Sequence, residues 1–312
     1  LILPSDPARI ILGPEAPLES VVILRHQLGL DQPIITQYLN WSASALRGEW
    51  GTSLDSQQQV SDILLTRFGN STVLLLGVLV VVVPIALLLG VTLALYRDSQ
   101  FDRGMLSALI FLKAVPGFLL GIALVLLFSM PGVNFLPAVA ILNPDISIWS
   151  QLSSLVLPVF ALSLAALPYL TRLVRSSMIE ALESDYVNAA RLRGVPEWRI
   201  IWLHTLPNAL VPAVQGVALT LRTLVGGALL AEGIFSFPGI GVTLNAAIQM
   251  RDLPLVQGIV LMTTVAVVAI NLLADLITVL LTPKLRTARH SIFIQRNRRG
   301  IQPWWRRSLA KA

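Results

Sequence analysis

Lysine, histidine and cysteine can bind phosphate, metal ions or protons, and this chain of 312 residues has few of them. The three lysines are Lys113, Lys284 and Lys311, and none follows a glycine as a G-x-x-x-x-G-K-[ST] phosphate loop requires. The three histidines, His26, His204 and His290, lie in separate segments without H-E-x-x-H spacing, and cysteine is absent. The sequence therefore predicts no ATP hydrolysis, no metal site and no enzymatic activity in this chain.

A short polar segment between two long apolar runs is the most informative part of the sequence. Ser184 or Asp185 can cap a helix over Tyr186–Arg193. Gly194 suits a left-handed turn at the end of that helix, and Pro196 suits the first turn of the next one. The residues alone leave two interpretations open, a surface connection or an element that docks on another protein.

Composition places this segment in a membrane protein. The chain is 55% hydrophobic and only 13% charged, and its mean hydropathy is +0.74, which is too apolar for a soluble protein of this length. Five stretches are long enough to cross a bilayer, which takes ~20 residues; they run over Ser71–Tyr96, Met105–Met130, Gln151–Leu173, Asn208–Ala231 and Leu255–Thr282. The predicted fold is an all-α, polytopic transmembrane helical bundle.

The distribution of lysine and arginine predicts the orientation in the membrane. Of the 23 basic residues, sixteen lie on one side of the predicted spans, five on the other and two within them. Positive charge gathers in the cytoplasm, so residues 1–70, with short helices over Leu18–Leu28 and Pro33–Leu46, are predicted to be extracytoplasmic. We expect a further helix before residue 1, giving six spans and two cytoplasmic ends in the intact protein. The basic tail over 283–312 then contacts lipid and cytoplasm, and no nucleic-acid partner is predicted.

The spacing within the polar segment resembles a known loop. Ala189-Ala190, then three residues, Gly194, nine residues and His204-Thr205-Leu206-Pro207 are similar to the "EAA" loop of ATP-binding cassette (ABC) importer permeases. The general pattern has Glu where Asn188 stands and Ile where His204 stands. Further stretches resemble the dipeptide/oligopeptide/nickel permease family: Leu3-Pro4-Ser5-Asp6-Pro7-Ala8, Leu28-Gly29-Leu30-Asp31-Gln32-Pro33, Gly48-Glu49-Trp50-Gly51-Thr52-Ser53-Leu54, Ser184-Asp185-Tyr186-Val187, Phe237-Pro238-Gly239-Ile240-Gly241, Arg251-Asp252-Leu253-Pro254-Leu255-Val256-Gln257-Gly258 and Asn271-Leu272-Leu273-Ala274-Asp275.

That resemblance implies a domain organisation and a set of partners. It implies a permease domain over 71–282 with a cytoplasmic coupling loop over 174–207, in a multi-pass protein of the bacterial plasma membrane. The implied partners are a second homologous permease, two ATPase subunits that hold ATP and magnesium, an extracytoplasmic substrate-binding protein and the lipid bilayer, with no cofactor in this chain. The implied coupling residues are Asp185, Tyr186, Ala189, Ala190, Arg191 and Gly194.

The implied function is import by alternating access, with di- or oligopeptides as substrate. A permease of the same family for nickel chelates or glutathione is an alternative. A stand-alone secondary transporter is another, although it predicts several mid-membrane acids and inverted repeats.

Ionisable residues inside the spans cost ~2.5–3.5 kcal/mol each on insertion scales and need a reason. Lys113 and Asp275 fall at similar depths, ~12 and ~10 Å from the inner end at ~1.5 Å per residue, so we hypothesise an ion pair; snorkelling of Lys113 is the alternative. Arg222 is expected to face the pore or the companion permease. Glu232 opens a Gly- and Pro-rich stretch, and the gate and pore candidates are Arg222, Glu232, Phe237, Pro238 and Gly239.

Overall fold

The described part of the chain is helical. The computed structural model describes residues 7–281 except 14, 28, 30, 131–135, 138 and 141–147. Within those residues the regular elements are helices, and the β pairing given for them is the isolated bridge between Thr52 and Gln59. The predicted all-α class is confirmed. The predicted basic tail over 283–312 lies outside the described residues.

Three short helices precede the long ones. They are α1 (Pro7–Leu12), α2 (Leu18–Gln27) and α3 (Ile34–Leu46). The last two match the predicted stretches within one residue at each end. Pro33 precedes the first turn of α3, where its missing N–H leaves no helical hydrogen bond unmade.

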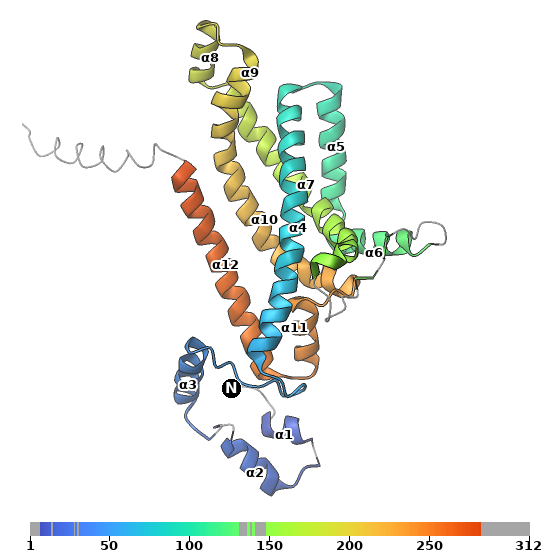
Figure 1. The fold of residues 1–312 in the computed structure, drawn as a ribbon, viewed down its shortest axis with the longest axis vertical. Helices are drawn as coiled ribbons and strands as arrows, with labels where there is room; N and C mark the ends of the chain where they lie inside the picture. The colour runs from blue at the N-terminus through green and yellow to red at the C-terminus, as the bar shows by residue number, and fades with distance from the viewer. Residues whose placement is uncertain are drawn as a thin grey trace, which may run out of the picture. The chain divides into compact units, whose positions relative to one another are not determined.

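Four long helices carry most of the apolar sequence (Figure 1). They are α4 (Val60–Leu95), α7 (Leu152–Leu182), α10 (Leu206–Ile234) and α12 (Leu253–Leu281). By length and composition each can cross a membrane. The helices extend beyond the predicted spans because polar turns, such as those of α4 before Ser71, continue the same helical backbone.

The second predicted span, Met105–Met130, is not one continuous helix. It is divided into α5 (Gln100–Ala114) and α6 (Gly117–Phe128), which meet at an angle of 93°. Pro116 occupies the N-cap of α6. A proline has no N–H for the preceding turn and pushes the residue before it out of the helical conformation, so the helix breaks there. The described residues therefore contain four spans, or up to five if the bent pair counts as one.

The chain forms two compact units. One comprises Leu1–Val82, Ile110–Leu167 and Thr223–Val267, and the other comprises Val83–Leu109, Pro168–Arg222 and Val268–Ala312. We call them the first and the second unit. Each of the four long helices contributes residues to both.

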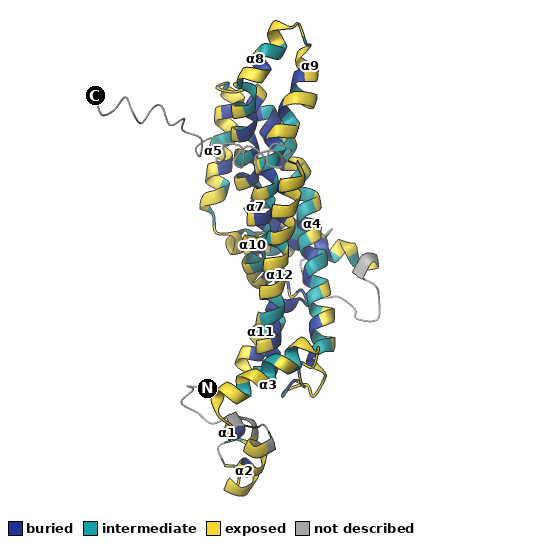
Figure 2. Ribbon diagram, turned by 90° about the vertical axis from the view of Figure 1, so that its left-hand side faces the viewer, coloured by how far each residue is buried: buried dark blue, intermediate teal, exposed yellow. Residues whose placement is uncertain are grey.

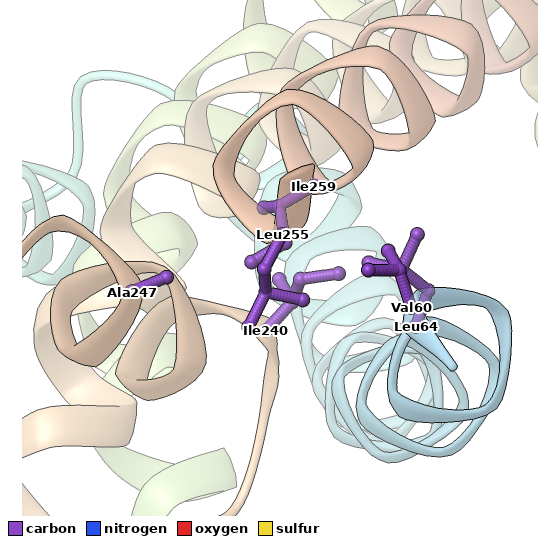
Figure 3. Close-up of a cluster of buried hydrophobic side chains, with 6 residues drawn as sticks. All are labelled: Val60, Leu64, Ile240, Ala247, Leu255 and Ile259. Carbon is purple, nitrogen blue, oxygen red and sulfur yellow. The ribbon is translucent and has the colours of Figure 1, made fainter. Parts of the chain in front are cut away.

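The first unit has a core where α4, α12 and a short helix, α11 (Ile240–Gln249), meet. Figure 3 shows its six buried side chains, Val60, Leu64, Ile240, Ala247, Leu255 and Ile259. A Cβ on Gly258 of α12 would lie 3.0 Å from the side chains of Val60 and Leu64, so the two helices approach closely at this glycine. Truncating a buried Leu or Ile in such a core costs about 2–5 kcal/mol.

The second unit has its own core between α4, α7 and α10. Its buried members are Val91, Ala94, Val174, Met178, Ala209 and Ala213. A Cβ on Gly90 would lie 2.6 Å from Cγ1 of Val174 and 3.0 Å from the carbonyl oxygen of Thr171. Gly90 therefore allows α4 and α7 to pack backbone against backbone.

Candidate functional site

The polar segment forms a short helix between the end of α7 and the start of α10. Helix α8 (Asp185–Leu192) is followed by α9 (Glu197–Arg199), a π-helical turn (Ile200–Thr205) and α10. Figure 1 shows α8 and α9 beyond the ends of α7 and α10, and Figure 2 shows much of their surface exposed. The predicted helix over Tyr186–Arg193 is confirmed within one residue at each end.

The start of α8 differs in detail from the prediction. Ser184 occupies the N-cap with an extended backbone, yet its hydroxyl makes no capping hydrogen bond. It donates instead to the carbonyl oxygen of Ala181, 2.5 Å away, at the end of α7. Asp185 lies in the first turn, where its negative charge is favourable beside the unpaired N–H groups of the helix start.

Gly194 ends α8 in the left-handed conformation that the sequence predicts, with φ of +76°. Its N–H donates to the carbonyl oxygen of Arg191 at 2.9 Å, and the N–H of Val195 donates to that of Ala190 at 3.1 Å. A Cβ placed on Gly194 would meet nothing within 4 Å. Glycine is therefore required here by the left-handed backbone conformation, and not because a side chain would lack space.

The side chains of α8 divide into an anchored face and an open face. Val187 is fully buried, whereas Leu192 is 90% exposed. Ala189 and Ala190 are half-buried, and Tyr186 is exposed. The predicted coupling residues lie together on this one turn-and-helix element, and Leu192, which the sequence reading did not select, is its most exposed apolar side chain.

Two polar contacts tie α8 to the elements that follow it. The guanidinium of Arg191 donates to Glu197 through Nε to Oε1 at 2.8 Å and through Nη2 to Oε2 at 3.3 Å. This hydrogen bond raises the pKa of Arg191 above its ordinary value, so the group stays cationic. The amide of Asn208 donates to the hydroxyl of Tyr186 at 3.1 Å. Arg191, one of the implied coupling residues, therefore has a carboxylate acceptor within its own chain.

A partly buried ion pair that the sequence does not predict lies in the same unit. The carboxylate of Asp102 on α5 accepts from Nε of Arg175 at 2.8 Å and from Nη2 at 2.5 Å. The Asp102 side chain is 2% exposed and that of Arg175 is 18% exposed. In the sequence, Asp102 and Arg175 each lie just outside a predicted span, and nothing in the sequence indicates that the two side chains meet.

The Gly- and Pro-rich stretch that opens with Glu232 forms a tight link between α10 and α11. Glu232 and Phe237 are fully buried. The hydroxyl of Ser71, on α4, donates to Oε1 of Glu232 at 2.6 Å, and the N–H of Gly241 donates to Oε2 at 2.6 Å. The structure therefore brings Glu232, Phe237, Pro238 and Gly239 together in the first unit.

Asp252 supports the other end of α11. Its Oδ1 accepts from the N–H of Leu255 at 3.2 Å and so caps α12, while its Oδ2 accepts from the hydroxyl of Ser53 at 2.5 Å and the N–H of Leu54 at 3.0 Å. An acid three residues before an apolar run is a recognisable helix start. The contact with Ser53, 199 residues away, has no indication in a single sequence.

The remaining charged candidates are not brought together by any contact that the structure gives. Lys113 and Asp275 are exposed and belong to different units, so their ion pair stays a prediction. Arg222 is exposed on α10. Among the described residues no three His, Asp or Glu side chains are grouped as a metal site would need.

Each unit contains one cavity of interest. In the first unit a cavity of about 590 Å³ lies beside α11, with polar lining residues that include Ser53, Arg67 and Asn245. In the second unit a cavity of about 380 Å³ is lined by aliphatic side chains of α4, α7, α10 and α12.

Apolar helices that can cross a membrane, with an exposed polar helix between two of them, define a multi-pass membrane protein. The chain belongs to the family of binding-protein-dependent transport system inner membrane components, which it matches over residues 86–287. Residues 1–76 match the N-terminal region described for these membrane components. The chain is therefore a permease component of a binding-protein-dependent transport system.

Two sequence relatives, both named as permease proteins, agree with this assignment. A peptide transport system permease protein of Brucella abortus is 36% identical over 285 residues, covering 91% of this chain and 90% of the relative. The glutathione transport system permease protein GsiC of Salmonella typhimurium is 33% identical with the same coverage. A chain of the inward-facing MetNI methionine ABC transporter has a TM-score of 0.49 at 19% identity, covering 72% of this chain and 94% of that chain. The sequence relatives thus include permeases named for two substrates.

Proposed function

We propose that this chain is a permease subunit of an ATP-driven importer of di- or oligopeptides, and that α8 is its coupling helix. The observation that carries the proposal is the geometry of α8, a short exposed helix ended by a left-handed glycine and carrying the exposed Leu192. An exposed leucine at the end of a polar helix is suited to a hydrophobic groove on a partner.

The proposed complex contains a second homologous permease, two ATPase subunits and an extracytoplasmic binding protein. ATP and magnesium bind on the ATPase subunits, and this chain holds no cofactor. Closure of the ATPases moves α8, which is anchored through Val187 and through the Asn208–Tyr186 contact. The motion passes to α7 and α10 and turns the pathway between inward-facing and outward-facing states.

The proposed orientation follows the charge distribution. The connection between α7 and α10 is cytoplasmic, residues 1–70 are extracytoplasmic, and both ends of the intact protein are cytoplasmic. The proposed cellular location is the bacterial plasma membrane.

Reconstitution tests this function directly. The full complex with its ATPases and binding protein is placed in proteoliposomes, and uptake of labelled dipeptides and oligopeptides is measured with ATP inside. Uptake should vanish when the phosphate-loop lysine of the ATPase is replaced. ATP-independent uptake driven by an ion gradient would instead support a secondary transporter.

Glutathione is the second candidate substrate because a relative with 33% identity is named for it. Competition in the same assay separates the candidates. Unlabelled peptides should inhibit peptide uptake, whereas inhibition by glutathione or nickel chelates alone would transfer the assignment to those substrates.

A further inference from the structure

Glu232 is a fully buried acid in the last turns of α10. Its carboxylate accepts from the hydroxyl of Ser71 and from the N–H of Gly241, both at 2.6 Å. A buried carboxylate is costly unless several donors surround it. Because Glu232 is fully buried and each of its carboxylate oxygens accepts a hydrogen bond within the chain, it is unsuited to direct contact with a transported molecule.

The hydroxyl group of Ser71 both donates and accepts a hydrogen bond. While its hydroxyl donates to Glu232, its oxygen accepts from the N–H of Ile240 at 2.8 Å. The first two N–H groups of α11, those of Ile240 and Gly241, thus donate to the side chains of Ser71 and Glu232. The N–H groups at the start of a helix have no partner within the helix, and negative charge is favourable beside them. Glu232 and Ser71 therefore cap the N-terminus of α11.

The preceding turns of α4 hold the same segment. The amide of Asn70 donates to the carbonyl oxygen of Pro238 at 2.9 Å, and Nη1 of Arg67 donates to it at 3.4 Å. A Cβ on Gly241 would lie 2.5 Å from Cα of Leu229, and one on Gly239 would overlap the carboxyl group of Glu232. The segment is therefore fixed by hydrogen bonds and by close packing.

We infer that Glu232 and Ser71 form a clamp that joins the segment Phe237–Gly241 to the Val60–Val82 part of α4. In transport these two side chains act as positioning residues, which hold the segment in place. With this clamp the segment moves together with that part of α4 and does not open as a separate lid. The inference rests on the proposed function only in taking the chain to be a subunit that transports a substrate.

A cross-link tests the motion without altering the clamp residues. The chain has no cysteine, so Asn70→Cys with Pro238→Cys introduces one pair of thiols on two residues that lie in contact, the amide of Asn70 being 2.9 Å from the carbonyl oxygen of Pro238. The full complex in proteoliposomes is treated with a short, reducible bifunctional thiol reagent. Uptake should stay within about twofold of the untreated level. Uptake that is lost on cross-linking and restored by reduction would overturn the inference, with the two single-cysteine variants as controls.

A second measurement does not depend on transport and therefore separates failure of the clamp from failure of the proposed function. Phe237→Cys places a thiol at a fully buried position, and its rate of labelling by a maleimide reports opening of the segment. Ser71→Ala removes the shared hydroxyl and should raise this rate at least about fivefold, the factor that corresponds to the ~1 kcal/mol contributed by one hydrogen bond. Ser71→Thr, which keeps a hydroxyl, should label at the original rate. Equal rates for Ser71→Ala and the parent would show that no clamp exists.

Discussion

Replacement of Gly194 should uncouple ATP use from transport without preventing membrane insertion. The turn after α8 requires φ of +76°, which residues with a side chain rarely adopt. Since no atom lies within 4 Å of the site of a Cβ, substitution perturbs the backbone alone. The effect should therefore depend on conformational preference and not on the size of the new side chain.

The expected magnitude comes from that preference. A residue with a side chain costs on the order of 1–2 kcal/mol in the left-handed conformation, which lowers the population of the native turn by a factor of about 5 to 30. Asparagine tolerates this conformation better than most residues. We expect uptake to fall in the order Gly194→Asn, Gly194→Ala, Gly194→Val, with the last reduced by at least about fivefold.

The assay compares ATP-driven uptake with the amount of inserted complex, measured by size-exclusion chromatography of a fluorescent fusion. Gly104 provides the matched control, because a Cβ there also meets nothing within 4 Å but the residue lies within helix α5 at no positive φ. Gly104→Ala should transport normally. Uptake by Gly194→Val equal to that of the parent would refute the reasoning.

Three further predictions concern stability and docking. Asp102→Asn leaves the partly buried guanidinium of Arg175 without its ion partner and should lower the free energy of unfolding by up to about 3 kcal/mol, seen as a lower thermal midpoint in detergent. Gly241→Ala forces a Cβ to within 2.5 Å of Cα of Leu229 and should lower the same midpoint, since overpacking costs about 1–3 kcal/mol. Leu192→Asp changes a side chain that is 90% exposed, so the midpoint should be unchanged while co-purification of the ATPase falls about tenfold.

Each of these predictions has a control of the same kind. Arg97→Gln breaks an exposed ion pair with Glu183 and should leave the thermal midpoint unchanged, unlike Asp102→Asn. Gly226→Ala adds a Cβ where nothing lies within 4 Å, so it should be tolerated. Leu46→Asp alters an equally exposed leucine on α3 and should not affect the ATPase. If a control behaved like its test variant, the corresponding explanation would be wrong.

Local features of this chain were predictable from sequence. The turn at Gly194 follows from the conformational freedom of glycine, and helix α8 follows from a polar segment of the right length between apolar runs. The long helices follow from hydropathy. The break at Pro116 follows from an equally local rule, but a continuous apolar run concealed it because hydropathy does not register a missing N–H.

Contacts between distant residues were not predictable from one sequence. Glu232 was identified as a charge that needs an explanation, but its partner Ser71 is 161 positions away. Asp102 and Arg175 are 73 positions apart, and neither has a local pattern that names the other. Such pairs depend on how helices pack, which the sequence periodicity of each helix does not specify.

The central claim is that α8 transmits the action of an ATPase to this permease, and site-specific cross-linking tests it most directly. A single cysteine at the exposed Leu192 carries a photoactivatable cross-linker in membranes that contain the complete transport system. The account predicts a covalent product with the ATPase subunit whose yield changes when ATP is added. Cross-links to lipid alone, in a preparation from which no ATPase co-purifies, would contradict it.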